Sequence, residues 1–124
     1  APVRGRALRV VGAAVALTWS GQHQNGTMKS ITVEQRRARE CVPLIDVREP
    51  EEFAAGRVPG AVNLPMSRIG ELLDQLPDGE FDVICALGGR SGRVVEALEA
   101  RGYDAVNVEG GTNGWIDAGY PVER

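Results

Sequence analysis

Residues 81–102 read FDVICALGGRSGRVVEALEARG and contain a complete strand–turn–helix unit. The mainly apolar residues 81–84 predict a short strand that leads into Cys85. The amphipathic stretch 91–101 predicts a helix, which ends at Gly102. The glycine-rich turn between them brings the thiol to the positive end of that helix, where backbone N–H groups form an anion-binding nest. Both effects favour a thiolate over a thiol, so the sequence predicts a nucleophilic cysteine.

Strand and helix patterns alternate along the rest of the chain after Met28. We expect short strands at residues 30–32, 42–47, 61–64, 82–85 and 105–108. We expect helices at residues 33–39, 50–55, 67–75, 91–101 and 112–118. Such alternation with short connections is typical of an α/β fold with a parallel sheet covered on both faces. A chain of 124 residues with 43% hydrophobic residues can bury one core, so we expect one domain.

Four patches of this sequence lie within about 75 residues of chain: LIDVREPEEF at 44–53, GRVPGAVNLP at 56–65, CALGGRS at 85–91 and EGGTNGW at 109–115. Together, and in this order, they resemble the single-domain rhodanese-type sulfurtransferase family. The resemblance implies a rhodanese-like α/β domain over residues 28–124, with a five-stranded parallel sheet and the cysteine loop at its C-terminal edge. One departure is Arg57, where many members carry histidine, and we interpret it as a change on the loop surface.

The resemblance also implies a reaction. In this family the cysteine that corresponds to Cys85 takes a sulfane sulfur from a donor such as thiosulfate, becomes a persulfide, and passes the sulfur to cyanide or a thiol, including a protein thiol. Cys85 would then be catalytic, Arg90 would help to hold the leaving oxyanion, and the substrate-binding residues would be Ala86, Leu87, Gly88, Gly89, Arg90 and Ser91. An anionic persulfide needs several N–H donors, which glycine-rich backbone can supply because glycine tolerates positive φ. The scheme needs no metal and no organic cofactor.

Other function classes stay open. A rhodanese-like module could carry sulfur to a partner, or sense oxidants, without useful turnover; the apolar Ala86 and Leu87 favour this alternative because they attract a free dianion weakly. Oxyanion phosphatases and arsenate reductases of similar fold place five residues between cysteine and arginine, whereas four separate Cys85 from Arg90, which leaves less space for phosphate and disfavours these activities. A cysteine protease is disfavoured because it needs a neighbouring imidazole, and the only histidine, His23, lies outside the resemblance.

The candidate residues also have structural interpretations. Cys85 could be a small buried hydrophobe, and a sulfur buried among aliphatic groups and turned from solvent would contradict the nucleophile hypothesis. Ser91 could be a helix N-cap, and Arg90 a solvated charge, although cations are disfavoured at a helix N-terminus. We expect Cys41 to be structural or a free surface thiol, since no spacing resembles a metal site or a Cys-x-x-Cys motif.

Other residues of the resembling patches also receive structural interpretations. Asp46 and Arg48 could lie near Cys85, since the C-terminal strand ends of a parallel sheet line the ligand crevice, but we interpret them as an ion-paired turn after a strand. A charged helix start follows, with Phe53 turned to the core; its charged residues are Arg48, Glu49, Glu51 and Glu52. For Trp115 we expect core filling or a pocket wall.

The charge of the chain is unevenly distributed. Of its 14 Lys and Arg and 17 Asp and Glu residues, the first 27 positions hold three arginines and no acid, so residues 28–124 carry 11 basic and 17 acidic side chains, a net −6. Nucleic acid backbones demand clustered cations, so we expect no nucleic acid partner. The resemblance implies small-molecule partners, namely the sulfur donor and its acceptor, and we expect no membrane partner.

Residues 1–27 are excluded from the fold argument. Three arginines precede the apolar run 10–19, and ten residues are too few to span a bilayer, which needs about twenty. The pattern is close to a signal peptide but lacks a convincing small-x-small cleavage site. We expect a disordered extension, or a segment upstream of a true start at Met28, in a cytoplasmic protein; a periplasmic or exported protein is the alternative.

Overall fold

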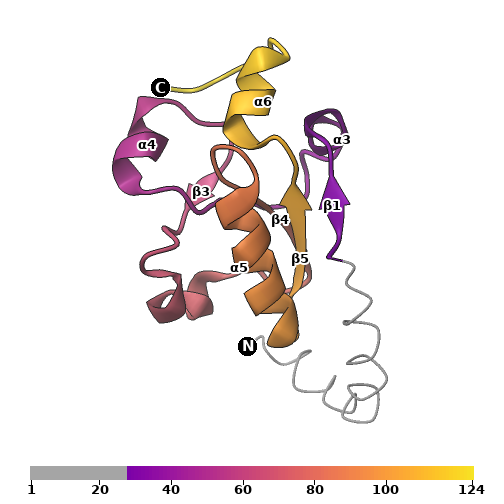
Figure 1. Ribbon diagram of the computed structural model, residues 1–124, viewed down its shortest axis with the longest axis vertical. Coiled ribbons are helices and arrows are strands. Elements are labelled where there is room, and N and C mark those ends of the chain that lie inside the picture. Colours follow the sequence, from indigo (N-terminus) through magenta and orange to yellow (C-terminus); the bar gives the residue numbers. More distant parts are fainter. Residues whose placement is uncertain (1–27) are drawn as a thin grey trace.

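Five short parallel strands carry the fold of residues 28–124, the part of the chain that this computed structural model describes (Figure 1). They are β1 (Ser30–Ile31), β2 (Leu44–Asp46), β3 (Val62–Asn63), β4 (Glu80–Ile84) and β5 (Asp104–Val108). The sheet order is β1-β5-β4-β2-β3, and every pairing is parallel. The predicted α/β fold with a five-stranded parallel sheet is confirmed. The predictions for residues 1–27 fall outside the described residues.

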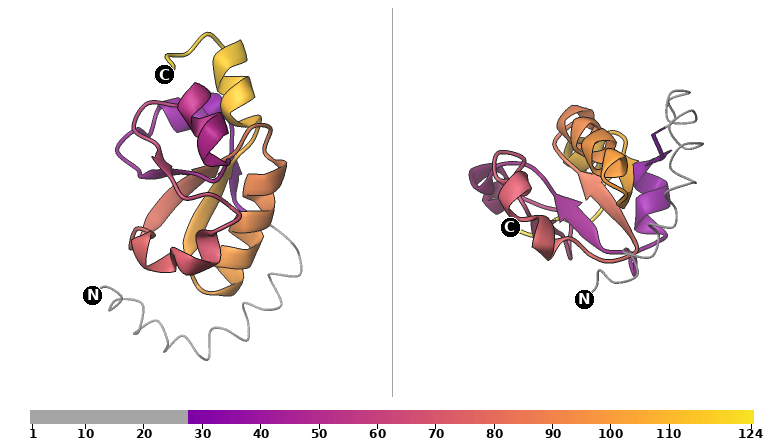
Figure 2. Two further views of the ribbon diagram at one scale, coloured as in Figure 1. Left: turned by 90° about the vertical axis from the view of Figure 1, so that its left-hand side faces the viewer. Right: turned by 90° about the horizontal axis from the view of Figure 1, so that it is seen from below.

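Helices and short 3₁₀ turns connect the strands. The helices are α3 (Val33–Arg37), α4 (Pro50–Ala55), α5 (Gly89–Ala100) and α6 (Gly111–Asp117), and the 3₁₀ turns are η1 (Ile69–Glu71) and η2 (Leu73–Gln75). The turned views of Figure 2 show α5 lying along the sheet. Within residues 28–124, no helix is long and apolar enough to cross a lipid bilayer.

The helix expected at residues 67–75 is wrong, because the segment forms η1 and η2 instead. Gly70 lies inside it, and glycine costs about 1 kcal/mol relative to alanine within a helix. At the far end Leu76 is extended, with φ −73° and ψ 145°, because the residue before a proline such as Pro77 avoids the helical region. The two turns still bring apolar side chains against the core, so the packing was satisfied without a continuous helix.

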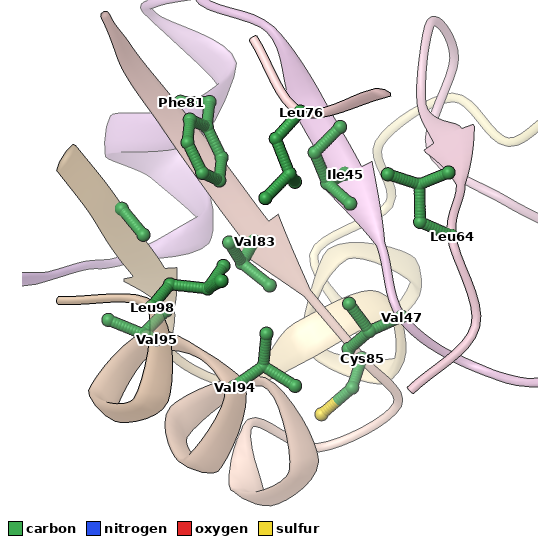
Figure 3. Packing of buried hydrophobic residues seen from close by; sticks show 11 residues of the cluster. Ile45, Val47, Leu64, Leu76, Phe81, Val83, Cys85, Val94, Val95 and Leu98 are labelled. Atoms are coloured by element: carbon green, nitrogen blue, oxygen red, sulfur yellow. The ribbon is translucent and has the colours of Figure 1, made fainter. Parts of the chain in front are cut away.

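Alternation along β4 divides the core between the two faces of the sheet. Successive side chains of a strand point to opposite faces, so Phe81, Val83 and Cys85 share one face and Ile84 lies on the other. The first face packs against α5 and the 3₁₀ turns, with Val94, Val95 and Leu98 among its buried residues (Figure 3). The second face packs against α6 and α3 through Leu44, Val108, Trp115 and Val33. The strand register therefore directs Cys85 toward α5.

A buried charge lies on the second face of β4. Asp82 is fully buried and accepts hydrogen bonds from Arg36 Nη1 at 2.7 Å, Arg39 Nη2 at 2.8 Å and Arg39 Nε at 3.1 Å. Arg36 is itself 4% exposed and also donates to the carbonyl of Val42 at 2.7 Å. This cluster fastens α3 and the chain after it to the sheet, on the face opposite Cys85.

Candidate active site

Cys85 follows the last residue of β4, at the carboxyl end of the parallel sheet. The Val47 N–H donates to the Ile84 carbonyl at 2.9 Å, so the chain leaving β2 runs beside the start of the cysteine loop. The chain then turns at Gly88, whose φ of 109° is in the left-handed region that favours glycine. Helix α5 begins at Gly89, two residues earlier than predicted. The loop between sheet and helix is therefore four residues long, from Cys85 to Gly88.

The sulfur of Cys85 faces this loop and the first turn of α5. Its Sγ accepts hydrogen bonds from the Gly88 N–H at 3.1 Å and from Ser91 Oγ at 3.3 Å. The residue is only 1% exposed, and Val47 and Val94 belong to the same buried cluster (Figure 3). The burial that would count against a nucleophilic Cys85 is therefore present. The surroundings are not only aliphatic, however, because two polar donors also contact the sulfur.

The hydrogen bonds around Cys85 outweigh its burial. Burial by itself raises the pKa of the Cys85 thiol, since it penalises the charged form. Hydrogen bonds from the Ser91 hydroxyl and from the N–H groups of Ser91, Gly88 and Leu87 act in the opposite direction. The net result is a pKa of Cys85 below its ordinary value of 9.0. The loop therefore favours a thiolate, the nucleophilic form of cysteine.

Ser91 is a hydrogen-bonding residue of the site and not the N-cap of α5. The N-cap is Gly88, so the alternative interpretation of Ser91 is wrong because the helix starts before it. Ser91 is completely buried, and its Oγ lies 2.5 Å from Oδ1 of Asn107 and 3.3 Å from the Gly88 carbonyl. Asn107 comes from β5 and was not predicted as a site residue, although a polar residue between Val106 and Val108 in an apolar strand was a usable signal.

The N-terminal turn of α6 holds the backbone of the cysteine loop by hydrogen bonds. Its N–H groups at Thr112 and Asn113 donate to the carbonyls of Cys85 at 2.8 Å and Ala86 at 3.0 Å. This approach requires glycine at 111, where φ is +60° and an added Cβ would lie 2.5 Å from both carbonyl oxygens. The Gly-Gly turn thus fixes the backbone that carries the sulfur.

Arg90 lies at the outer side of the loop in a two-point ion pair. Its Nη1 and Nη2 donate to Oε1 and Oε2 of Glu52 at 2.8 and 2.9 Å. This hydrogen bond lowers the pKa of Glu52 from 4.5 to about 2, and the pKa of Arg90 is raised above its ordinary value for the same reason. Glu52 was predicted only as part of a charged helix start, and nothing in the sequence pairs it with Arg90.

The remaining loop side chains bring little polarity. Leu87 is 71% exposed, while Ala86 is half-buried and Gly89 is exposed. Cys41 is an exposed free thiol, in agreement with one of its two predicted states. Among residues 28–124, no group of three or more His, Cys, Asp or Glu side chains is placed to hold a metal ion.

The structural interpretations of the neighbouring patches are mostly confirmed. Asp46 and Arg48 form a buried ion pair, with Arg48 Nη2 2.8 Å from Asp46 Oδ2. Trp115 is 5% exposed and fills the core. Phe53 does not turn to the core; it is half-buried beneath Arg57, whose guanidinium carbon lies 5.0 Å from the centroid of the ring.

Fold and site together define a class of protein: an α/β domain whose parallel sheet ends in a short, amide-rich cysteine loop before a helix. The chain belongs to the rhodanese-like family, since the family model described as the rhodanese-like domain matches residues 31–118.

Relatives and solved structures agree with this membership. The chain is 36% identical over 96 residues to a sulfurtransferase of Allochromatium vinosum, covering 75% of this chain and 90% of the relative. It is 45% identical over 83 residues to YtwF of Bacillus subtilis, named only provisionally as a sulfurtransferase, covering 66% and 81%. A rhodanese-related protein of Thermoplasma volcanium superposes with a TM-score of 0.73 at 38% identity, covering 77% of this chain and 97% of that one.

A rhodanese-like domain protein of Staphylococcus aureus has a TM-score of 0.70 at 41% identity, covering 78% of this chain and 100% of that one. The likeness therefore extends over nearly the whole length of both solved chains.

Proposed function

We propose that this chain is a sulfurtransferase that carries a sulfane sulfur as a persulfide on Cys85. The donor is thiosulfate or another persulfide source, and the acceptor is cyanide or a thiol, including a protein thiol. One observation carries the proposal: the Cys85 sulfur receives hydrogen bonds from the Gly88 N–H and Ser91 Oγ, and its pKa is lowered although it is buried. The proposal assigns this activity to a domain spanning residues 28–124.

The proposed cycle has two displacements on sulfur. The Cys85 thiolate attacks the outer sulfur of thiosulfate, an S–S bond forms, the S–S bond of thiosulfate breaks, and sulfite leaves with its electron pair. The acceptor then attacks the outer sulfur of the persulfide, whose S–S bond breaks to regenerate the thiolate. Cyanide leaves as thiocyanate, and a thiolate leaves as a new persulfide. No external oxidant, metal or organic cofactor enters the scheme.

Each loop residue has a role in this proposal. The backbone of Ala86, Leu87, Gly88 and Gly89 surrounds the outer sulfur and stabilises its charge with N–H groups. Ser91 donates to the inner sulfur from the position seen at 3.3 Å. Arg90 holds the leaving oxyanion through N–H groups that Glu52 does not occupy, because a guanidinium has five and the ion pair uses two.

The proposal is tested by sulfur loading. Because Cys41 is a second, exposed thiol, the parent protein carries Cys41→Ser. After excess thiosulfate and desalting, we expect the intact mass of this parent to increase by one sulfur atom and to return on addition of cyanide. The matched control carries Cys85→Ser as well and is expected to keep its mass. An unchanged mass of the parent at saturating thiosulfate would contradict the catalytic role of Cys85.

A sulfur-delivery module is the second candidate function. Glu52 neutralises Arg90, and the most exposed side chain of the loop is the apolar Leu87, so the loop offers little attraction to a small dianion. A high KM for thiosulfate together with rapid transfer from a protein persulfide would favour delivery. A low KM and steady turnover with thiosulfate and cyanide would favour the enzyme.

A further inference from the structure

The buried hydroxyl of Ser91 has more acceptors than hydrogens. A hydroxyl carries one hydrogen, so it donates one hydrogen bond at a time. Three acceptors lie within reach of Ser91 Oγ: Asn107 Oδ1 at 2.5 Å, Cys85 Sγ at 3.3 Å and the Gly88 carbonyl at 3.3 Å. The shortest of these contacts leads away from the sulfur. Donation to Cys85 therefore competes with donation to Asn107.

The surroundings of Asn107 determine which end of its amide meets Ser91. Asn107 is 4% exposed, and its Nδ2 lies 3.5 Å from the Gly88 carbonyl. Turning the amide over would place Oδ1 beside that carbonyl, so that two acceptors would face each other in a buried site. The amide oxygen is consequently the end that faces Ser91, and it accepts the hydroxyl hydrogen.

We propose that Asn107 is a positioning residue that competes with Cys85 Sγ for the single hydrogen of Ser91 and so sets how strongly the thiolate is stabilised. The proposal deepens the proposed function, since it concerns the sulfur that would react. In the thiolate form, the charged Sγ attracts the hydroxyl hydrogen away from Asn107. In the persulfide form, the inner sulfur is neutral and a weaker acceptor, and the hydrogen returns to Oδ1. Asn107 thus weakens the hydrogen bond from Ser91 to the thiolate and accepts the hydroxyl hydrogen in the persulfide form, without touching the donor or acceptor molecule.

Within residues 28–124, the charged groups around Cys85 form one connected set that includes Arg90. Arg90 on α5 interacts electrostatically with Cys85 and favours its thiolate. Glu52 on α4 and Asp46 at the end of β2 also interact with Arg90, and Asp46 is paired with Arg48. A substitution at Asn107 leaves this set in place, so its effect on Cys85 can be assigned to the hydrogen bond through Ser91.

The test is a set of Cys85 pKa values, measured in protein that carries Cys41→Ser. The ultraviolet absorbance of the thiolate is followed against pH, which requires no reagent to reach the buried sulfur, and a Cys85→Ser protein supplies the baseline. Asn107→Leu removes the competing acceptor and is expected to lower the Cys85 pKa by about half a unit to one unit. Asn107→Asp supplies a stronger acceptor and is expected to raise it by about one unit or more.

The same substitutions in Ser91→Ala protein separate the effect that passes through the Ser91 hydroxyl from all other effects of changing Asn107. Without the hydroxyl, the shift from Asn107→Leu should vanish, and the shift from Asn107→Asp should shrink to the part caused by its charge alone. A purely structural role would move the pKa in the same direction for both substitutions. Circular dichroism checks folding, and Asn107→Ala replaces the leucine variant if that one does not fold.

Two results would overturn the proposal. A raised pKa in Asn107→Leu would mean that the amide N–H faces Ser91 and assists its donation to sulfur. Equal shifts with and without the Ser91 hydroxyl would mean that Asn107 does not act through Ser91. Both readouts are independent of sulfur loading, so failure of the proposed persulfide chemistry would leave them unchanged and would be recognised separately.

Discussion

The guanidinium of Arg90 and the carboxylate of Glu52 form a two-point ion pair, at 2.8 and 2.9 Å, that joins the first turn of α5 to the first turn of α4. Glu52 Oε1 also accepts the Glu49 N–H at 2.9 Å, so the carboxylate is fixed by its own helix. Arg90, which follows the cysteine loop in the first turn of α5, therefore has a fixed anionic partner. This relationship limits how strongly the loop can attract an anionic donor.

Removal of the Glu52 charge should increase the use of thiosulfate. Glu52→Gln leaves Arg90 with a net positive charge near the approaching dianion, and a contribution of about 1 kcal/mol corresponds to roughly a fivefold rise in kcat/KM. Steady-state kinetics at low ionic strength measures the effect. Glu51→Gln, on the exposed side of the same helix, is the matched control for the change in net charge. Equal gains in both variants would show that the ion pair itself does not limit the donor.

Arg90→Ala tests the cationic member of the same ion pair. If Arg90 holds the leaving sulfite, its loss should reduce kcat/KM for thiosulfate about tenfold or more, while transfer from the loaded persulfide to cyanide stays nearly normal. Single-turnover measurements of loading and unloading distinguish the two steps. A normal loading rate would remove Arg90 from the mechanism.

The ion pair also predicts a pH dependence of stability. The pKa of Glu52 is lowered from 4.5 to about 2, so its contribution is fully present above 4.5 and is lost as the pH falls through about 2. The side chain is 38% exposed, so the contribution is small, on the order of 1 kcal/mol or less. Melting curves of wild type and Glu52→Gln should differ at about pH 5 to 7 and converge as the pH falls below about 2. A difference that does not depend on pH would contradict the assignment.

Much of the fold was predictable because local patterns and tertiary packing agree in it. The β4–loop–α5 unit has an apolar strand, a glycine turn and an amphipathic helix, and its predicted boundaries hold within two residues. The segment at residues 67–75 was mispredicted because its apolar residues fit a helix period, while Gly70 and Pro77 allow only short turns. Periodicity reports which side chains are buried, and it does not fix the backbone that buries them.

Only the site residues that are close together in the sequence could be predicted. Cys85, Gly88 and Ser91 are neighbours in the sequence, so their proximity could be inferred from the turn. Glu52 and Asn107 reach the same place from α4 and β5, through the strand order β4-β2 and β5-β4, which sequence patterns do not specify. A polar residue in an apolar strand could have indicated Asn107, but its partner required the register of the sheet.

The close approach of α6 to the cysteine loop can be tested at Gly111. Gly111→Ala would place a Cβ 2.5 Å from the carbonyl oxygens of Cys85 and Ala86, at a φ of +60°. We expect a loss of about 2–4 kcal/mol in unfolding free energy, from left-handed strain of about 1–2 kcal/mol plus the displacement of the loop, and slower sulfur loading. Chemical denaturation measures the first effect and intact mass the second.

Gly60→Ala is the matched control for Gly111→Ala. Gly60 has a φ of +87°, and its added Cβ would meet nothing within 4 Å, so this variant carries the strain without the collision. It should lose only about 1–2 kcal/mol and load sulfur at the normal rate. Equal losses in the two variants would show that α6 and the loop can move apart at little cost in free energy.

The buried cluster of Asp82, Arg36 and Arg39 should affect stability but not sulfur loading. Asp82→Asn removes the counter-ion of Arg36, whose side chain is 5% exposed, and leaves a guanidinium buried without its carboxylate. Such a loss costs about 3–5 kcal/mol, because the desolvated charge is no longer compensated. Glu80→Gln is the matched control, since Glu80 pairs with Arg39 at 3.1 Å but is 39% exposed and should contribute about 1 kcal/mol or less.

Because Asp82 projects from the face of β4 opposite Cys85, sulfur loading per folded molecule should be unchanged in both variants well below their melting temperatures. Slower loading in folded Asp82→Asn protein would mean that the charge cluster influences the cysteine loop through the strand itself.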